Sequence, residues 1–260
     1  MHPTLENAGG AVARWCPAAV RHFVLATACL GLCGYVLLYG RPGADQPVHS
    51  DGYSYYVYVP SVLVYHDTTL DALALDWYGG DYPDFTGIRR LPTTRRFLNP
   101  HPIGTAVLMA PFVIVGHALT WWANLPPDGF SLFYQHAAAL AGLFYLCAGL
   151  AILRRTLARS FTAPVVLATL AVVTWGTNLF HYGVYDGTFS HVFSFFLVCA
   201  LTELTVLWWS APSAGRSIGL GVVSGLVVLT RHTDAVFLLL IPFYGVTHGT
   251  EAKARAREIW

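Results

Sequence analysis

Charged residues are scarce in this sequence. Asp, Glu, Lys and Arg make up 11% of the 260 residues, against roughly 25% in an ordinary soluble domain. This composition argues against a soluble globular protein. The net charge is only +1, and fourteen arginines and one lysine are scattered between apolar runs. No basic face is present that could neutralise many phosphates, so nucleic-acid binding is set aside.

Charge is absent altogether from four long runs, at 22–40, 97–127, 129–153 and 160–185. About 20 consecutive apolar residues are enough to cross a bilayer as a helix. The sequence therefore predicts an all-α fold, a polytopic transmembrane helical bundle.

A cysteine motif and a cleavable signal are also missing. The five cysteines form no CxxC pair and no cluster with histidine, so free thiols are expected rather than a redox or metal site. The first apolar run follows Arg14 and Arg21, is as long as a full span and has no small-residue cleavage site. We expect it to remain as a signal anchor.

About seven membrane segments are expected from the apolar runs. They lie near 22–40, 103–123, 131–153, 163–180, 190–209, 217–230 and 235–248. Together they make one transmembrane module over 22–248, with a cytoplasmic N-terminus at 1–21, a long extracytoplasmic insert at 41–101 and a cytoplasmic tail at 249–260.

The orientation follows from the bias of Arg and Lys toward cytoplasmic loops. This bias places both termini and the loop with Arg154, Arg155 and Arg159 inside, and the acidic insert outside. The insert is then outside and the loop that begins at Arg154 inside, so the chain between them must cross the membrane an odd number of times. Two apolar segments, 103–123 and 131–153, lie between them. Either one segment does not span fully or part of the insert dips into the membrane, and 53–65 is predicted as an interfacial helix.

Asp51 is the first candidate for chemistry. It lies about ten residues beyond the first apolar run, in the stretch HSDGYSYY. A carboxylate just outside the bilayer could act as the general base on an acceptor hydroxyl. The alternative is a structural role, in which Asp51 caps the helix that follows it.

Four arginines form two pairs in the insert, Arg89 with Arg90 and Arg95 with Arg96. Guanidinium groups bind phosphate in a bidentate manner and would suit a lipid phosphate head group. The alternatives are a solvated loop that pairs with the nearby aspartates, and a general interaction with anionic lipid. His101, which precedes the next apolar segment, either contacts substrate or is an interfacial residue.

Asp186 lies in a polar stretch between two apolar runs, with His181 before it and His191 after it. These residues could form a second acid/base pair or a metal site, although their spacing matches no fixed metal geometry. The alternative for Asp186 is a helix cap. No cofactor is predicted, and a divalent metal stays open.

Glu203 and Arg231 lie within or between apolar runs, where charges are costly. We expect Glu203 to neutralise Arg231 as a structural pair, with a proton relay as the alternative.

Several of these stretches together resemble the N-terminal membrane module of the GT-C superfamily of glycosyltransferases. The similarity is to the bacterial branch that resembles protein O-mannosyltransferases and lipid A aminoarabinose transferases. The residues that carry it are Asp51-Gly52 with the tyrosines that follow, Asn99 to Phe112, Arg154-Arg155, Gly176 to Asn178 with Tyr182, Ser190 and His191, and Leu229 to Arg231. It covers most of residues 20–245.

The resemblance implies an enzyme that passes a sugar from a polyprenyl-phosphate donor to an acceptor outside the membrane, with inversion at the anomeric carbon. By position, Asp51 matches the catalytic Asp of the first outer loop and Asp186 an acidic residue of the second. The insert arginines would hold the donor phosphate, and His101, His191 and Arg231 are the other substrate-binding candidates. The expected location is a bacterial cytoplasmic (inner) membrane, and the expected partners are the lipid-linked sugar, the bilayer and other membrane subunits.

The sequence departs from the superfamily in one respect. Its members usually continue with further helices and an outer domain, whereas this sequence stops at Trp260. It is therefore interpreted as part of a longer enzyme, as a shortened relative that works with a partner, or as a non-catalytic structural subunit of a larger complex. A transporter is disfavoured, because no inverted repeat of segments is seen.

Overall fold

The computed structural model describes the backbone of residues 4–246 and the side chains of residues 17–246, and the predicted tail at 249–260 lies outside this range. Helices dominate the described residues. Their only strands are two short ones, β1 (Arg89–Arg90) and β2 (Phe97–Leu98), which pair antiparallel. The prediction of a helical class is confirmed.

Four helices within residues 4–246 are long and apolar enough to cross a membrane. They are Pro17–Tyr39 of α1 (Thr4–Tyr39), α5 (Gly104–Trp122), α6 (Leu132–Leu157) and α9 (Ser190–Ser210). Shorter apolar helices are α7 (Ala163–Trp175), α10 (Ala214–Thr230) and the stretch formed by η2 (His232–Leu239) and α11 (Leu240–Phe243). Four of the seven expected segments therefore have the length of a full span. Their length and apolar composition are those of a membrane protein.

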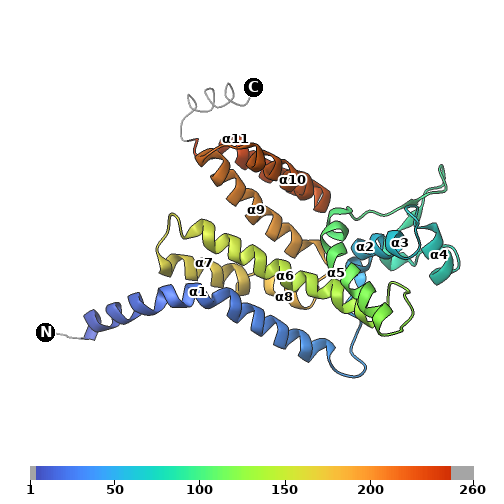
Figure 1. Ribbon diagram of the computed structural model, residues 1–260, viewed down its shortest axis with the longest axis horizontal. Helices are drawn as coiled ribbons and strands as arrows, with labels where there is room; N and C mark the ends of the chain where they lie inside the picture. Colours follow the sequence, from blue (N-terminus) through green and yellow to red (C-terminus); the bar gives the residue numbers. More distant parts are fainter. Residues whose placement is uncertain (1–3, 247–260) are drawn as a thin grey trace.

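Helix α6 lies at the centre of the bundle, where it contacts α1, α5, α7, α8 (Leu179–Val184) and α9 (Figure 1). It runs antiparallel to α1. Near the start of α6, the Tyr35 hydroxyl is bonded to His136 Nδ1 at 2.6 Å, and near its end Arg154 Nη1 donates to the Arg21 carbonyl at 2.9 Å. We name the two ends of the bundle the Tyr39 end, where α1 finishes, and the Arg154 end, where α6 finishes.

Helix α5 lies beside only the first part of α6. The Tyr145 hydroxyl, near the middle of α6, donates to the Leu108 carbonyl at 3.1 Å. Further along α5, Gly116 packs against the Phe133 carbonyl at the start of α6. The first residue of α5 is therefore beside the middle of α6 and does not reach the Arg154 end.

The expected segment 163–180 is two helices, α7 and α8, rather than one. The hydroxyl of Thr177 lies in the break between them. It donates to the Val173 carbonyl at 2.7 Å and is 3.2 Å from the Leu179 amide, which donates to it. This side chain therefore bonds backbone groups of both helices and favours a local break.

The connection from α1 to α5, residues 40–103, contains α2 (Ser50–Tyr56), α3 (Tyr58–Leu63), α4 (Asp71–Tyr78), the turn η1 (Asp84–Thr86) and the β1–β2 hairpin. The helix predicted over 53–65 is thereby found as two short helices, α2 and α3, and its place at the membrane interface stays a prediction. Pro60 is in the first turn of α3, where its missing N–H costs no helical hydrogen bond. Figure 1 shows this connection at one end of the molecule, beyond α5 and α6.

Glycines permit close backbone contacts around the loop 185–189, which joins α8 to α9. A Cβ added to Gly142 of α6 would overlap the Gly187 carbonyl, and one added to Gly187 would overlap the Ala139 carbonyl. A Cβ on Gly52 of α2 would overlap the hydroxyl of Thr188. The loop therefore lies directly on α6 and supports the start of α2.

A similar contact joins α5 to α10. A Cβ on Gly104 would overlap the backbone between Leu229 and Thr230, at the end of α10. The residues just before α5 and just after α10 are therefore held near each other.

We predict that Gly142→Ala lowers the stability of the protein by about 1–3 kcal/mol, because α6 and the loop must separate to admit the methyl group. Thermal unfolding in detergent measures the change. Gly225→Ala is the control, since Gly225 is also helical but a Cβ there meets open space. Equal melting temperatures for the two variants would contradict this packing.

Candidate functional site

Five of the predicted site residues lie around one end of the bundle. Arg231 is bonded to His191 at the start of α9, His49 links Asp186 to the chain two residues before Asp51, and His101 lies beside Asp51. We name Asp51, His101, Asp186, His191 and Arg231 the site cluster. They come from α2, the α1–α5 connection, the loop 185–189, α9 and the residue after α10, so residues far apart in sequence are brought together.

Asp51 is an exposed carboxylate with a half-buried histidine behind it. Its carboxylate lies 4.0 Å from His101 Nε2, and the side chains are 59% and 18% exposed, respectively. Within the described residues Asp51 accepts no hydrogen bond, so the predicted capping role does not explain why an aspartate is present here. Its negative charge in the first turn of α2 does interact favourably with the helix dipole.

His101 is held so that only one side of its ring faces Asp51. Its ring lies edge-on to Tyr55 at 4.6 Å, and its Nδ1 is buried with no hydrogen-bond partner among residues 4–246. Burial lowers the pKa of the His101 imidazole below its ordinary value, against the opposing charge of Asp51. A neutral imidazole therefore lies next to an exposed carboxylate at neutral pH.

The peptide that carries His101 is fixed by Asn99. The Asn99 amide donates to the Ser54 carbonyl of α2 at 2.7 Å, and the His101 amide donates to Asn99 Oδ1 at 3.0 Å. The Tyr58 hydroxyl of α3 donates to the His101 carbonyl at 2.8 Å. These three hydrogen bonds fix the backbone just before α5 and hold His101 beside Asp51.

The Asp186 carboxylate bridges two histidines. His49 Nε2 lies 3.0 Å from one carboxylate oxygen and His181 Nε2 lies 2.9 Å from the other, while the Asp186 side chain is only 13% exposed. His49 Nδ1 also lies 3.1 Å from the Gln46 carbonyl, which can only accept. His49 therefore links Asp186 to the chain just before α2.

His49 is a site residue that sequence reasoning missed. It is two residues before Asp51, which is the one signal that could have drawn attention to it. Within residues 4–246 no group of three His, Cys, Asp or Glu side chains has the arrangement of a metal site. A divalent metal stays an open prediction.

Arg231 is bonded to His191 rather than to Glu203. Arg231 Nη1 donates to His191 Nδ1 at 2.9 Å, and the His191 ring stacks on Tyr182 at 4.0 Å. The predicted pair of Glu203 with Arg231 is wrong. Glu203 is buried near the Arg154 end and binds Arg159 Nη2 at 2.5 Å, because α9 runs from the site cluster to that end.

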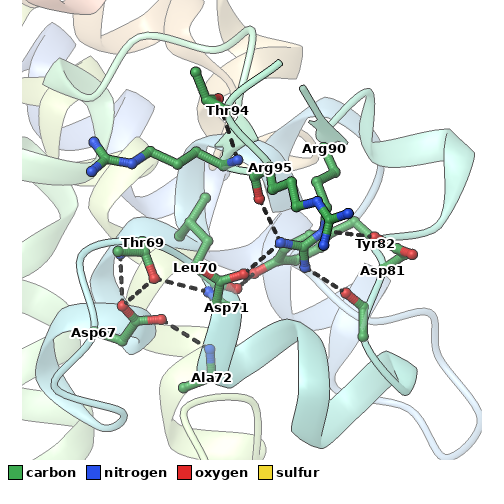
Figure 2. A network of polar contacts seen from close by, with 12 residues as sticks. Asp67, Thr69, Leu70, Asp71, Ala72, Asp81, Tyr82, Arg90, Thr94 and Arg95 are labelled. Atoms are coloured by element: carbon green, nitrogen blue, oxygen red, sulfur yellow. Dashed lines mark hydrogen bonds and ion pairs between the residues drawn. The ribbon is translucent and has the colours of Figure 1, made fainter. Parts of the chain in front are cut away.

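The four insert arginines do not form one clamp. Arg90 is occupied within the connection: it donates to Asp71 at 2.9 Å, to Asp81 at 3.3 Å and to the Arg95 carbonyl at 2.7 Å, as Figure 2 shows. Its guanidinium also lies 4.1 Å from the centre of the Phe97 ring. Arg89, Arg95 and Arg96 are exposed. In the part of the chain that is described, no hydrogen bond or ion pair joins these arginines to the site cluster.

Asp67 organises the start of α4 in the same network (Figure 2). Its carboxylate accepts from the Thr69 amide at 2.7 Å and the Ala72 amide at 2.9 Å. Burial acts to raise the pKa of Asp67, but these hydrogen bonds outweigh it and the pKa lies below its ordinary value. Arg90 and Asp67 therefore serve the local fold.

Two cavities adjoin the site cluster. An apolar groove of about 260 Å³ lies between α3 and α5; its lining is Tyr58, Val59, Val62, Leu63, Ile103, Ala106, Val107, Ala110 and Ile114. A pocket of about 480 Å³ with aromatic, acidic and amide side chains includes His49, Ser50, Tyr53, Trp77, Asp45 and Gln135 in its lining. Asp51 directly follows two residues of the second pocket, and His101 is two residues before Ile103 of the first.

Comparison of the chain with protein-family models, curated proteins and solved structures finds no match. The function is therefore inferred from the site cluster and its surroundings. The similarity to GT-C glycosyltransferases stays a prediction.

We predict that Arg90→Gln loosens the connection, because Asp71, Asp81 and the Arg95 carbonyl lose their common donor. Backbone amides over residues 79–98 should exchange with deuterium roughly tenfold faster. Arg89→Gln removes the same charge from an exposed neighbour and should leave exchange unchanged. Equal exchange in the two variants would contradict the structural role of Arg90.

Proposed function

We propose that this chain is a GT-C-like membrane glycosyltransferase module, which transfers a sugar from a polyprenyl-phosphate donor to an extracytoplasmic acceptor. The observation that carries the proposal is the exposed Asp51 carboxylate, supported by neutral His101 at the end of an apolar groove. An apolar groove suits a lipid chain, and an adjacent carboxylate suits removal of a proton from an acceptor hydroxyl.

The proposed topology places the site cluster outside the cytoplasmic membrane. We take α1, α6, α7 with α8, α9, α10, and η2 with α11 as six passages between the two ends, and α5 as a helix that does not cross. This is supported by the start of α5 beside the middle of α6, and it removes the parity conflict. Arg21, Arg154, Arg155 and Arg159 then lie on the cytoplasmic side, as the positive-inside bias requires.

In this proposal Asp51 takes the proton from an acceptor hydroxyl. The acceptor oxygen forms a bond to the anomeric carbon while the bond from that carbon to the donor phosphate oxygen breaks, and polyprenyl phosphate leaves. Attack opposite the leaving group inverts the anomeric carbon. Arg231, fixed by His191, is placed to stabilise the charge that develops on the phosphate.

Asp186 has a positioning role in this scheme. Its bonds to His49 and His181 tie the chain before α2 to the loop 185–189. Because Ser50 and Asp51 follow His49 directly, this tie sets the position of the base. The pocket lined by His49, Ser50 and Tyr53 is proposed to hold the acceptor.

Asp51→Asn tests the assignment of the base. We expect sugar transfer from a polyprenyl-phosphate donor in membrane vesicles to fall by at least about 100-fold, the usual range for loss of a general base. Asp84→Asn, another exposed aspartate of the connection, is the control and should keep full activity. Unchanged transfer by Asp51→Asn would remove Asp51 from the mechanism.

A non-catalytic structural subunit is the alternative. It is favoured by large exposed apolar residues such as Trp121 and Trp122, 64% and 81% exposed, which could face protein as well as lipid. A stoichiometric partner that co-purifies in mild detergent, with no turnover by the unaltered chain, would support this alternative.

A further inference from the structure

A groove between α1 and α6 lies at the Arg154 end, away from the site cluster. Its volume is about 590 Å³, and it is lined by Pro17, Val20, Arg21, Ala151, Ile152, Arg154, Arg155 and Ala158. Five of these side chains are apolar and three are arginines. A cavity of this kind suits a ligand with an apolar part and an anionic part.

Positive charge exceeds negative charge around this groove. Arg155 Nε lies 3.1 Å from Glu203, which also binds Arg159. Among the described side chains, those of residues 17–246, no carboxylate lies within ion-pair distance of Arg21 or Arg154. At this end of the described bundle, Arg21, Arg154, Arg155 and Arg159 therefore outnumber the one carboxylate, Glu203. The carboxyl end of α6 adds only about half a negative charge.

Arg154 is held ready to bind an anion. Its Nη1 donates to the Arg21 carbonyl of α1 at 2.9 Å, which fixes the half-buried guanidinium across the groove. Nε and Nη2 make no hydrogen bond within the described residues, so one edge of the fork is left for a ligand. A phosphate can accept two parallel bonds from such an edge.

We propose that this groove binds one anionic phospholipid, whose phosphate contacts Arg21, Arg154 and Arg155 and whose acyl chain lies along Val20, Ala151 and Ile152. A lipid is favoured over a soluble phosphate because most of the lining is apolar and both helices are long enough to span a bilayer. Basic pockets between membrane helices are suited to anionic head groups. The inference does not depend on the proposed glycosyltransferase activity.

Native mass spectrometry of the full chain in detergent, titrated with phosphatidylglycerol or with phosphatidylcholine of the same acyl chains, tests this proposal. We expect one phosphatidylglycerol to bind with roughly tenfold preference. Arg21→Gln with Arg154→Gln should abolish the preference. Arg21→Lys with Arg154→Lys keeps the charge and should retain much of it, provided that circular dichroism shows both variants folded.

The matched control is Arg89→Gln with Arg96→Gln, which removes two exposed charges from the hairpin and should leave the preference unchanged. An equal loss in the two glutamine variants, or equal binding of the two lipids to the unaltered chain, would overturn the proposal. Glycerol phosphate at millimolar concentration should not compete. Competition by it would assign the groove to a soluble phosphate and would likewise overturn the lipid.

Discussion

The close contact between α6 and the loop 185–189 is the constraint on which the site depends. Gly142 and Gly187 bring two backbones together with no side chain between them, and Gly52 seats α2 on the same loop. Because the loop cannot move away from α6, Asp186 is fixed at the Tyr39 end, and His49 is drawn to it. Asp51 then follows two residues later. Small residues at contacts, which allow helices to approach closely in a membrane, here position the polar groups as well.

The polar groups of this chain are divided between two ends of one apolar bundle. At the Tyr39 end, Asp51, Asp186 and Arg231 form a mixed cluster with four histidines in contact or ion-pair range. At the Arg154 end, arginines outnumber the single Glu203. Buried charges are costly unless paired, and each end meets this cost by local pairing. The first arrangement suits chemistry on a substrate, and the second suits attachment to an anionic surface.

Charge-free apolar runs predict where the long helices lie, because lipid-facing and buried helices are both continuously apolar. They also predicted that Asp51 and Asp186 lie on one side. The break at Thr177 was not predicted, since it depends on one hydroxyl that bonds both helices. The partners of Arg231 and Glu203 were mispredicted, because the direction and depth of each helix decide them and no local pattern records either. Arg90 looked equivalent to Arg89, and only the fold of the hairpin separates a structural arginine from exposed ones.

Side-specific cysteine labelling tests the central claim that the two ends of the bundle face opposite sides of the membrane. In a background without the five native cysteines, Ser50→Cys and Ser160→Cys each place one exposed thiol, next to Asp51 and beyond α6, respectively. With a thiol reagent that cannot cross the membrane, Ser50→Cys should react in intact cells and Ser160→Cys only after permeabilisation. Reaction of both from the same side, or the reverse pattern, would contradict the topology and the outward-facing site together.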